Sequence, residues 1–140
     1  MKKLASKANE LLQALAAYLN QPLIELDGNY SAAVTIGRYN FVFSFSECGM
    51  YLLSRVPITV LPGCGRRGDL LRQLVASNYS SAGTLGGIVG LEKETGLIWL
   101  TYRFWLKQGN AEDFLKTIAL QTGLAEYWLK TVTTNPALTD

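Results

Sequence analysis

The chain has 140 residues, of which 49% are hydrophobic and 17% charged, so we expect a single globular domain over residues 1–140 with a substantial core. Its net charge is only +2 and its thirteen basic residues are scattered, which argues against a nucleic-acid partner. Histidine is absent, which excludes imidazole-based catalysis and histidine-ligated metal sites.

The first segment predicts an amphipathic helix that ends before Pro22. Lys7, Glu10 and Gln13 fall on its polar side, and the leucines and alanines of the other side recur at helical spacing. This stripe comprises Leu4, Ala8, Leu11, Leu12, Leu15, Ala16 and Leu19. We expect the helix to pack on a sheet; the alternative is that part of it also lines a groove for a partner.

The same segment does not have the pattern of a signal peptide. Met1–Leu4 carries two lysines, but Lys7, Asn9 and Glu10 interrupt the apolar run that should follow. No apolar run approaches the ~20 residues that cross a bilayer. The two cysteines form no CxxC motif. We therefore expect a cytoplasmic protein with free thiols and no membrane insertion.

Three strands are predicted after a turn at residues 27–29, over about residues 30–36, 41–45 and 50–60. Phe41, Phe43 and Phe45 alternate with smaller residues, so we expect the three rings to face the core. Pro57 interrupts the third predicted strand, which suggests a sheet edge or a bulge there.

Residues 63–68 spell the glycine pattern GxGxxG. A dinucleotide site also needs an acidic residue about twenty positions later on a parallel strand, and no acidic residue occurs before Glu92. We interpret the segment as a flexible connection between the preceding strand and the following helix. An enzyme that uses Cys64, with Arg66 and Arg67 lowering its pKa, is kept as a third hypothesis.

The stretch from residue 69 to residue 105 predicts a helix, a strand, a turn and a second strand. Asp69 is a suitable N-cap, and one helical face carries leucines and ends near Asn78. The strands are expected over residues 84–91 and 97–105, joined by a turn in which Gly96 supplies a positive φ.

The second of these strands is apolar on both faces. One face carries Ile98, Leu100, Tyr102 and Phe104, and the other carries Leu97, Trp99, Thr101, Arg103 and Trp105. An antiparallel strand with one wet face normally alternates apolar and polar residues. We therefore expect both faces to be covered, one by the chain's own helices and one by a second subunit or a partner.

The last helix is predicted to follow Asn110 as N-cap, with Glu112 and Asp113 in its first turn. Two apolar stripes suggest burial on more than one side, and Gly123 suggests a close approach of another segment. The stripes are Phe114, Leu115, Ile118, Ala125, Leu129 and Val132, and Leu120, Leu124 and Trp128. The element order α-βββ-α-ββ-α predicts an α+β domain whose helices pack against an antiparallel sheet.

This order resembles the class I chaperones of bacterial type III secretion, the Tir-chaperone family. Residues 70–78 resemble the leucine-rich second helix of that family, which ends near an asparagine. Residues 87–104 resemble its hairpin, and residues 111–128 its last helix. The resemblance covers nearly the whole chain and consists of apolar and glycine patterns.

The resemblance implies a cytoplasmic, dimeric chaperone without cofactor, ATP use or catalysis. It implies binding to an N-terminal segment of a secreted effector or translocator, which is held unfolded for export. It also implies a homodimer or heterodimer interface formed by Leu70, Leu71, Leu74, Val75, Gly87, Val89 and Leu91. The candidates for partner binding are Leu11, Leu15, Trp99 and Trp105.

One feature departs from the family pattern. Members are typically acidic, whereas the pI of this chain is about 8.6, which leaves room for an unusual cargo or a heterodimeric partner chaperone. A small-ligand-binding or regulatory domain of the same fold, in which the aromatic face lines a pocket, is the alternative function.

Overall fold

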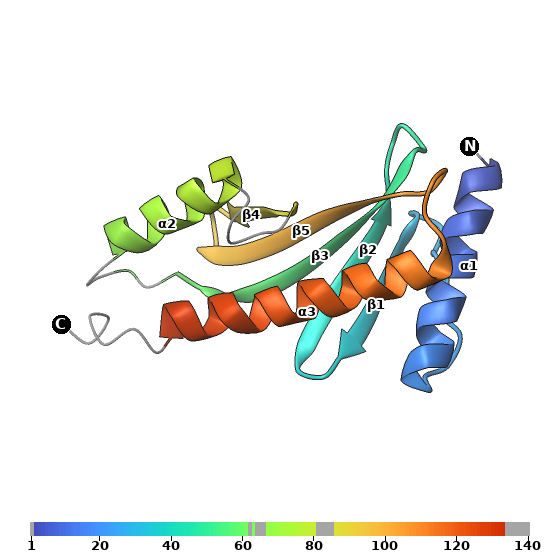
Figure 1. Cartoon of the computed structure of the whole chain (residues 1–140), viewed down its shortest axis with the longest axis horizontal. Helices are drawn as coiled ribbons and strands as arrows, with labels where there is room; N and C mark the ends of the chain where they lie inside the picture. Colours follow the sequence, from blue (N-terminus) through green and yellow to red (C-terminus); the bar gives the residue numbers. More distant parts are fainter. Residues whose placement is uncertain (1, 62, 64–66, 81–85, 134–140) are drawn as a thin grey trace. The chain divides into compact units, whose positions relative to one another are not determined.

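A computed structural model describes residues 2–61, 63, 67–80 and 86–133. In this part of the chain, three helices and five strands follow the predicted order α-βββ-α-ββ-α (Figure 1). The strands form one antiparallel sheet in the order β1-β2-β3-β5-β4. The elements are α1 (Lys2–Leu19), β1 (Ser31–Ile36), β2 (Tyr39–Phe45), β3 (Tyr51–Val60), α2 (Arg67–Ser80), β4 (Ile88–Leu91), β5 (Leu97–Trp105) and α3 (Ala111–Thr133).

Internal contacts divide the chain into two compact units. The first unit comprises Met1–Arg55 and Arg103–Leu120, and the second comprises Val56–Tyr102 and Gln121–Asp140. The elements β3, β5 and α3 each contribute residues to both units. The prediction of a single domain stays a prediction, and each unit is described by itself below.

Aromatic side chains form the centre of the first unit. Phe41 and Phe43 are fully buried, which confirms that the alternating phenylalanines of β2 face the core. Phe114 of α3 packs its ring 5.9 Å from the ring of Phe43 and 5.2 Å from that of Phe104, edge to face. Such tilted contacts between buried rings are favourable beyond the area that they remove from water.

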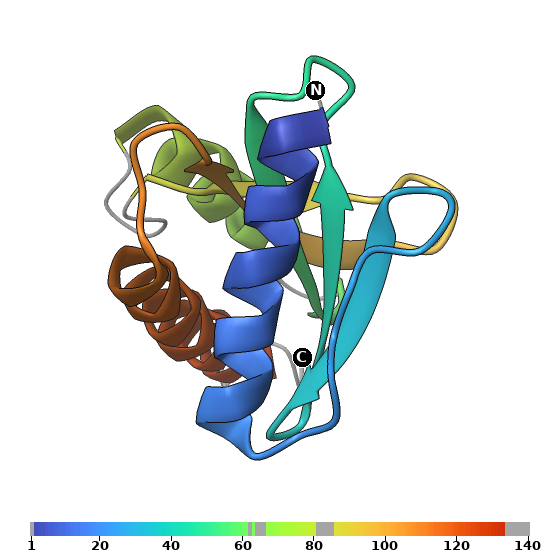
Figure 2. The same cartoon turned by 90° about the vertical axis from the view of Figure 1, so that its right-hand side faces the viewer.

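The helix α1 runs beside the strands of the first unit (Figure 2). It ends at Leu19, and Asn20 then adopts a left-handed conformation with φ of 54°, as is common for the residue after a helix. The following connection is attached to the helix because the Leu26 amide donates a hydrogen bond to the Asn9 side chain (2.9 Å).

The connection between α1 and β1 also satisfies backbone groups of β1, which is an edge strand. Gln21 Nε2 donates to the Thr35 carbonyl at 2.8 Å. The Asp27 amide donates to the Ser31 carbonyl at 2.8 Å, and Asp27 Oδ1 accepts from the Ser31 amide at 3.0 Å. Covering an edge in this way limits pairing with strands of other molecules.

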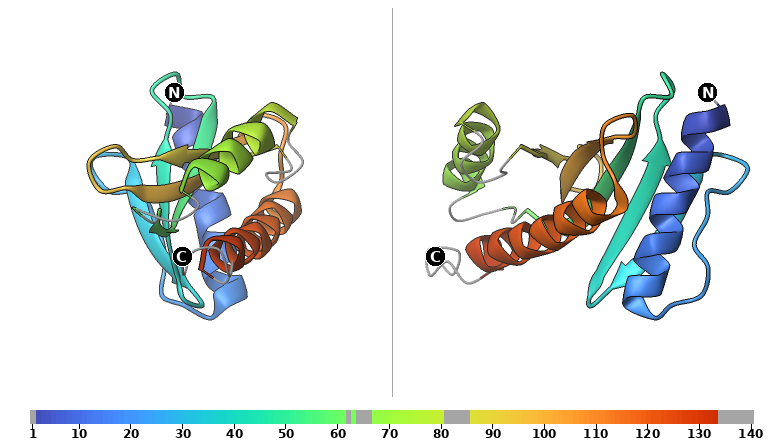
Figure 3. Two further views of the ribbon diagram at one scale, coloured as in Figure 1. Left: turned by 90° about the vertical axis from the view of Figure 1, so that its left-hand side faces the viewer. Right: turned by 45° about the vertical axis from the view of Figure 1, so that its right-hand side comes forward.

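The second unit places α2 against the hairpin of β4 and β5, as the left view of Figure 3 shows. Its core includes Ile98, Leu100 and Trp128. Gln121 of α3 is fully buried as well, and its Nε2 donates to the Leu100 carbonyl at 3.0 Å. The sequence analysis missed Gln121 because a polar residue between two apolar stripes gives no hydrophobic signal.

Two expectations about α2 and the strand after it require correction. The helix begins at Arg67, so Asp69 lies inside its first turn, where it pairs with Arg72 at 3.0 Å and is not the N-cap. The expected strand over residues 84–91 begins only at Ile88. Residues 84 and 85 lie outside the described part of the chain, and Gly86 has a φ of +99°.

The expectation of a close approach at Gly123 also requires correction, whereas Pro57 lies at a local edge. Strand β3 lies between β2 and β5 in the sheet order. Its register with β2 ends at Arg55, so the ring of Pro57 interrupts no pairing with β2. An added Cβ at Gly123 meets no atom within 4 Å, so no described segment approaches it closely.

We expect Gly87→Ala to lower the free energy of unfolding by about 1–3 kcal/mol because the new methyl group overpacks the core. An added Cβ collides with the ring of the buried Tyr102 and lies 3.0 Å from the Thr101 carbonyl oxygen. Gly90→Ala is the matched control, since a Cβ there meets nothing within 4 Å. Denaturant titration of both variants checks this, and equal stabilities would contradict it.

Candidate partner-binding surfaces

The position of β4 against α2 depends on one amide side chain. Asn78 Nδ2 donates to the Val89 carbonyl at 2.7 Å, and Asn78 Oδ1 accepts from the Val89 amide at 2.7 Å. The side chain therefore occupies both backbone groups of Val89, as a neighbouring strand would. The asparagine at the end of the predicted helix is thus the residue that fixes this helix to the strand.

Two leucines of α2, Leu70 and Leu74, are buried in the second unit. The next residues along the helix, Leu71 and Val75, line a shallow apolar groove with Arg72, Ala76 and Tyr79. Val75 is 67% exposed and Tyr79 94% exposed. We call Leu71, Val75, Ala76 and Tyr79 the α2 groove.

The residues suggested for a dimer interface therefore fall into two groups. Leu70, Leu74, Gly87 and Val89 are buried within the chain, whereas Leu71, Val75 and Leu91 reach the surface. Tyr79 was not predicted, although it continues the spacing of Leu71 and Val75 at i+4 and i+8. The assignment of these residues to a dimer interface stays a prediction.

The alternation expected along β5 is confirmed. Ile98, Leu100, Tyr102 and Phe104 are all buried. Trp99 is partly exposed and Trp105 is 46% exposed. The second face of the strand is therefore only partly covered by the described residues, and both tryptophans suggested for partner binding belong to it.

Trp105 lies in an aromatic cluster of the first unit. Its ring is 5.1 Å from that of Tyr51, in an edge-to-face arrangement. The guanidinium of Arg103 lies over the ring of Tyr51, 5.4 Å from the ring centroid. Backbone pairing holds the strand ends together, because the Leu106 amide donates to the Met50 carbonyl at 3.1 Å. We call Tyr51, Arg103 and Trp105 the Tyr51 cluster.

The two α1 residues suggested for partner binding do not lie on the surface. Leu11 and Leu15 are buried in the first unit with Ala8 and Leu12. Their role in partner binding is not tested here, but in this structure they contribute to the core. The exposed large apolar residue of α1 is Tyr18.

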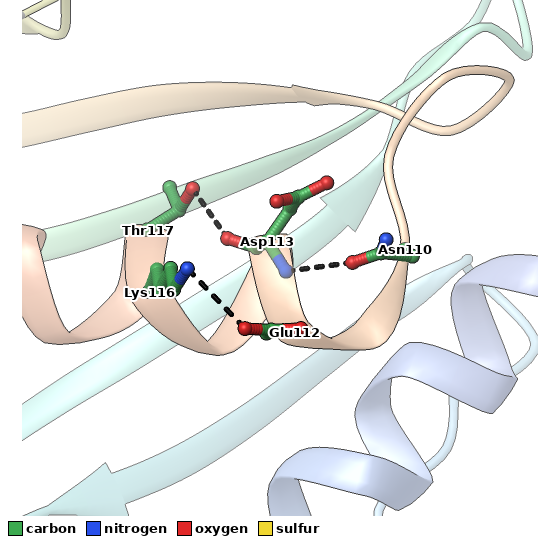
Figure 4. Close-up of polar contacts among 5 residues, drawn as sticks. All are labelled: Asn110, Glu112, Asp113, Lys116 and Thr117. Carbon is green, nitrogen blue, oxygen red and sulfur yellow. Dashed lines mark hydrogen bonds and ion pairs between the residues drawn. The ribbon is translucent and has the colours of Figure 1, made fainter.

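The acidic residues at the start of α3 stabilise the helix (Figure 4). The Asp113 amide donates to Asn110 Oδ1 at 2.8 Å, which confirms Asn110 as the N-cap. Glu112 pairs with Lys116 at 3.3 Å, and both side chains are largely exposed. Negative charge here also interacts favourably with the helix dipole.

The described residues offer little chemistry for the enzyme hypothesis. Cys64 and Arg66 lie outside the described part, and Arg67 Nη1 donates to the Leu61 carbonyl at 3.3 Å. Cys48 is exposed, and its contact with the Ser46 hydroxyl is the main cause that lowers the pKa of its thiol. Within the described ranges, no three metal-ligating side chains gather at one place.

None of the described helices is long and apolar enough to cross a membrane. The Tir chaperone protein (CesT) family model matches residues 10–129. The chain belongs to this family. The class I chaperones of type III secretion, which the sequence resembles, are therefore its relatives. A comparison with curated proteins gave no significant match.

Solved structures share the fold of this family member. A chain of the ExsC–ExsE complex is 23% identical with a TM-score of 0.79, over 91% of this chain and 95% of that chain. A chain of the HopA1–SchA chaperone–effector complex is 13% identical with a TM-score of 0.74, over 90% of this chain and 95% of that chain. A chain of the complex between the Yersinia pestis type III secretion chaperone SycH and a stable fragment of YscM2 is 19% identical with a TM-score of 0.65, over 89% of this chain and 98% of that chain.

We expect Asn78→Asp to lower the free energy of unfolding by about 1–3 kcal/mol, because a carboxylate oxygen then faces the Val89 carbonyl without a donor between them. Amide hydrogen exchange at Val89 should accelerate in the same variant. Gln73→Glu makes the same amide-to-carboxylate change at an exposed position of α2 and should leave both quantities unchanged. Normal protection of Val89 in Asn78→Asp would contradict the assigned role.

Proposed function

We propose that this chain is a cytoplasmic chaperone of type III secretion without enzymatic activity. It binds an N-terminal segment of a secreted effector or translocator and keeps that segment unfolded and ready for export, without ATP. The match of residues 10–129 to the Tir chaperone family carries this proposal. The solved structures that share the fold support it, since they include a chaperone–effector complex and a secretion chaperone in complex with a protein fragment.

The surface of the chain supports binding to a protein more than to a small ligand. Its exposed apolar residues include Val75 of α2, Ile88 of β4 and Trp105 of β5. Exposed apolar surface of this kind commonly marks contact with another protein. The family match likewise favours the chaperone over the small-ligand alternative.

A second copy of this chain is the proposed occupant of the α2 groove. The accessible residues of α2 lie beside a strand, β4, whose Ile88 and Leu91 are also exposed. Asn78 holds this strand against the helix, so that both elements can contribute exposed apolar residues to one interface. A related chaperone as the second subunit is the alternative, as the family resemblance allows.

We expect Val75→Glu to shift the dimer toward the monomer, because association would bury an unpaired carboxylate. Light scattering after size-exclusion chromatography measures the mass, and we expect at least about a tenfold weaker dimer, since burying an unpaired charge costs several kcal/mol. Gln73→Glu adds the same charge to α2 outside the groove and should remain dimeric. An unchanged mass for Val75→Glu, across a dilution series, would place the interface elsewhere.

The cargo-binding prediction concerns Trp105. Affinity capture of the tagged chain from its native host should recover a larger protein held through its N-terminal region, with two copies of this chain in the complex. We expect Trp105→Asp to abolish recovery while circular dichroism and thermal unfolding stay close to those of the unaltered chain, because Trp105 is half-exposed and its apolar ring is a suitable anchor.

Tyr127→Asp is the control for this experiment, since Tyr127 is a similarly exposed aromatic residue of α3. It should recover the same larger protein in the same amount. Recovery of that protein by Trp105→Asp would show that the Trp105 assignment is wrong. Recovery of no protein by the unaltered chain would contradict the proposed function itself.

A further inference from the structure

The Tyr51 cluster combines exposed apolar surface with a fixed positive charge. Trp105 is 46% exposed, and its ring packs edge to face against that of Tyr51. Arg103 is exposed, and its guanidinium lies over the Tyr51 ring, 5.4 Å from the ring centroid. An arginine stacked on an aromatic ring is held in place yet keeps the edge of its guanidinium, with its N–H donors, accessible to an incoming group.

No acidic side chain neutralises this cluster within the described part of the chain. The sheet register pairs Ser44 with Leu53 and Val42 with Arg55, and these residues alternate with the buried ones of β2 and β3. These four residues therefore lie on the same face of the sheet as Tyr51. The only charged residue that β2 and β3 contribute to this face is a second arginine, Arg55.

The nearest acid in the sequence is Glu47, in the turn before β3. Its side chain is exposed, and it forms no ion pair with Arg103 among the described residues. The charge of Arg103 is therefore directed to solvent or to a bound molecule. Its field extends to the Cys48 thiol, where Arg103 is one of the smaller causes that lower the pKa.

We infer that the Tyr51 cluster docks an extended segment that carries an acidic residue next to an apolar one. The carboxylate of this segment binds the guanidinium edge of Arg103, and the apolar side chain packs on Trp105. Carboxylates bind arginine with paired, charge-assisted hydrogen bonds, and a face without acids does not repel them. The inference rests on the proposed function, because the segment belongs to the secreted partner.

The overall charge of the chain agrees with this choice of partner. The net charge is +2 and the pI is about 8.6. Charge complementarity increases the rate of association and disfavours partners of the same sign. A positive docking face therefore favours acidic segments over basic ones. Apolar contacts by themselves do not distinguish segments by their charge.

A displayed library of random twelve-residue peptides tests the inference without knowledge of the cargo. The unaltered chain should enrich peptides that contain Asp or Glu close to an aromatic or aliphatic residue. Synthetic copies of the enriched peptides, measured by fluorescence anisotropy, should bind Arg103→Glu at least about tenfold more weakly, as expected for the loss of a charge-assisted contact. Arg103→Lys should retain part of the affinity.

Arg38 provides a matched control, because its guanidinium also lies over a tyrosine ring, 5.5 Å from the centroid of Tyr39. Arg38→Glu makes the same charge change at the turn between β1 and β2 and should enrich and bind the same peptides as the unaltered chain. Equal weakening in Arg38→Glu and Arg103→Glu would overturn the inference in favour of a non-specific charge effect.

Two other results would also overturn the inference. One is enrichment of neutral or basic peptides by the unaltered chain, and the other is failure to enrich any peptide. In either case, capture of a larger protein from the native host would show that the proposed function stands and that only the acidic docking point is wrong. If capture fails as well, the proposed function falls with it.

Discussion

The alternation of side chains along β5 is the constraint on which the rest of the structure depends. A strand directs successive residues to opposite faces, so burying Ile98, Leu100, Tyr102 and Phe104 places Trp99, Arg103 and Trp105 on the other face. One choice of register thus builds the core and, at the same time, the surface that carries tryptophan and arginine. A slip by one residue would exchange the two sets completely.

The sheet edges are a second constraint, and polar side chains satisfy backbone groups at both of them. Gln21 and Asp27 satisfy backbone groups of β1, whereas Asn78 satisfies both backbone groups of Val89 on β4. Buried or half-buried backbone groups need such partners. An extended segment that adds to the β1 edge therefore has to displace hydrogen bonds that the chain itself makes, which favours side-chain anchoring on the open sheet face.

Helix α2 shows how one short segment serves two purposes. Leu70 and Leu74 hold it to its own unit, and the neighbouring Leu71 and Val75 remain on the surface. A helix that contributed all its leucines to the core would leave no apolar area for a second subunit. The helix therefore directs one pair of apolar residues into its own unit and leaves the neighbouring pair accessible on an adjacent face.

Local spacing in the sequence determined the element order, the alternation along β2 and β5, the Asn110 cap and the positive φ of Gly96 (+73°), because each depends on neighbouring residues alone. The tertiary structure decided which leucines of α1 and α2 are buried, since helical spacing defines a stripe but not its partner. It also paired Asn78 with Val89, Gln121 with Leu100 and Tyr51 with Arg103. These residues are distant in sequence, and their contacts exist only because the sheet and helices bring them together.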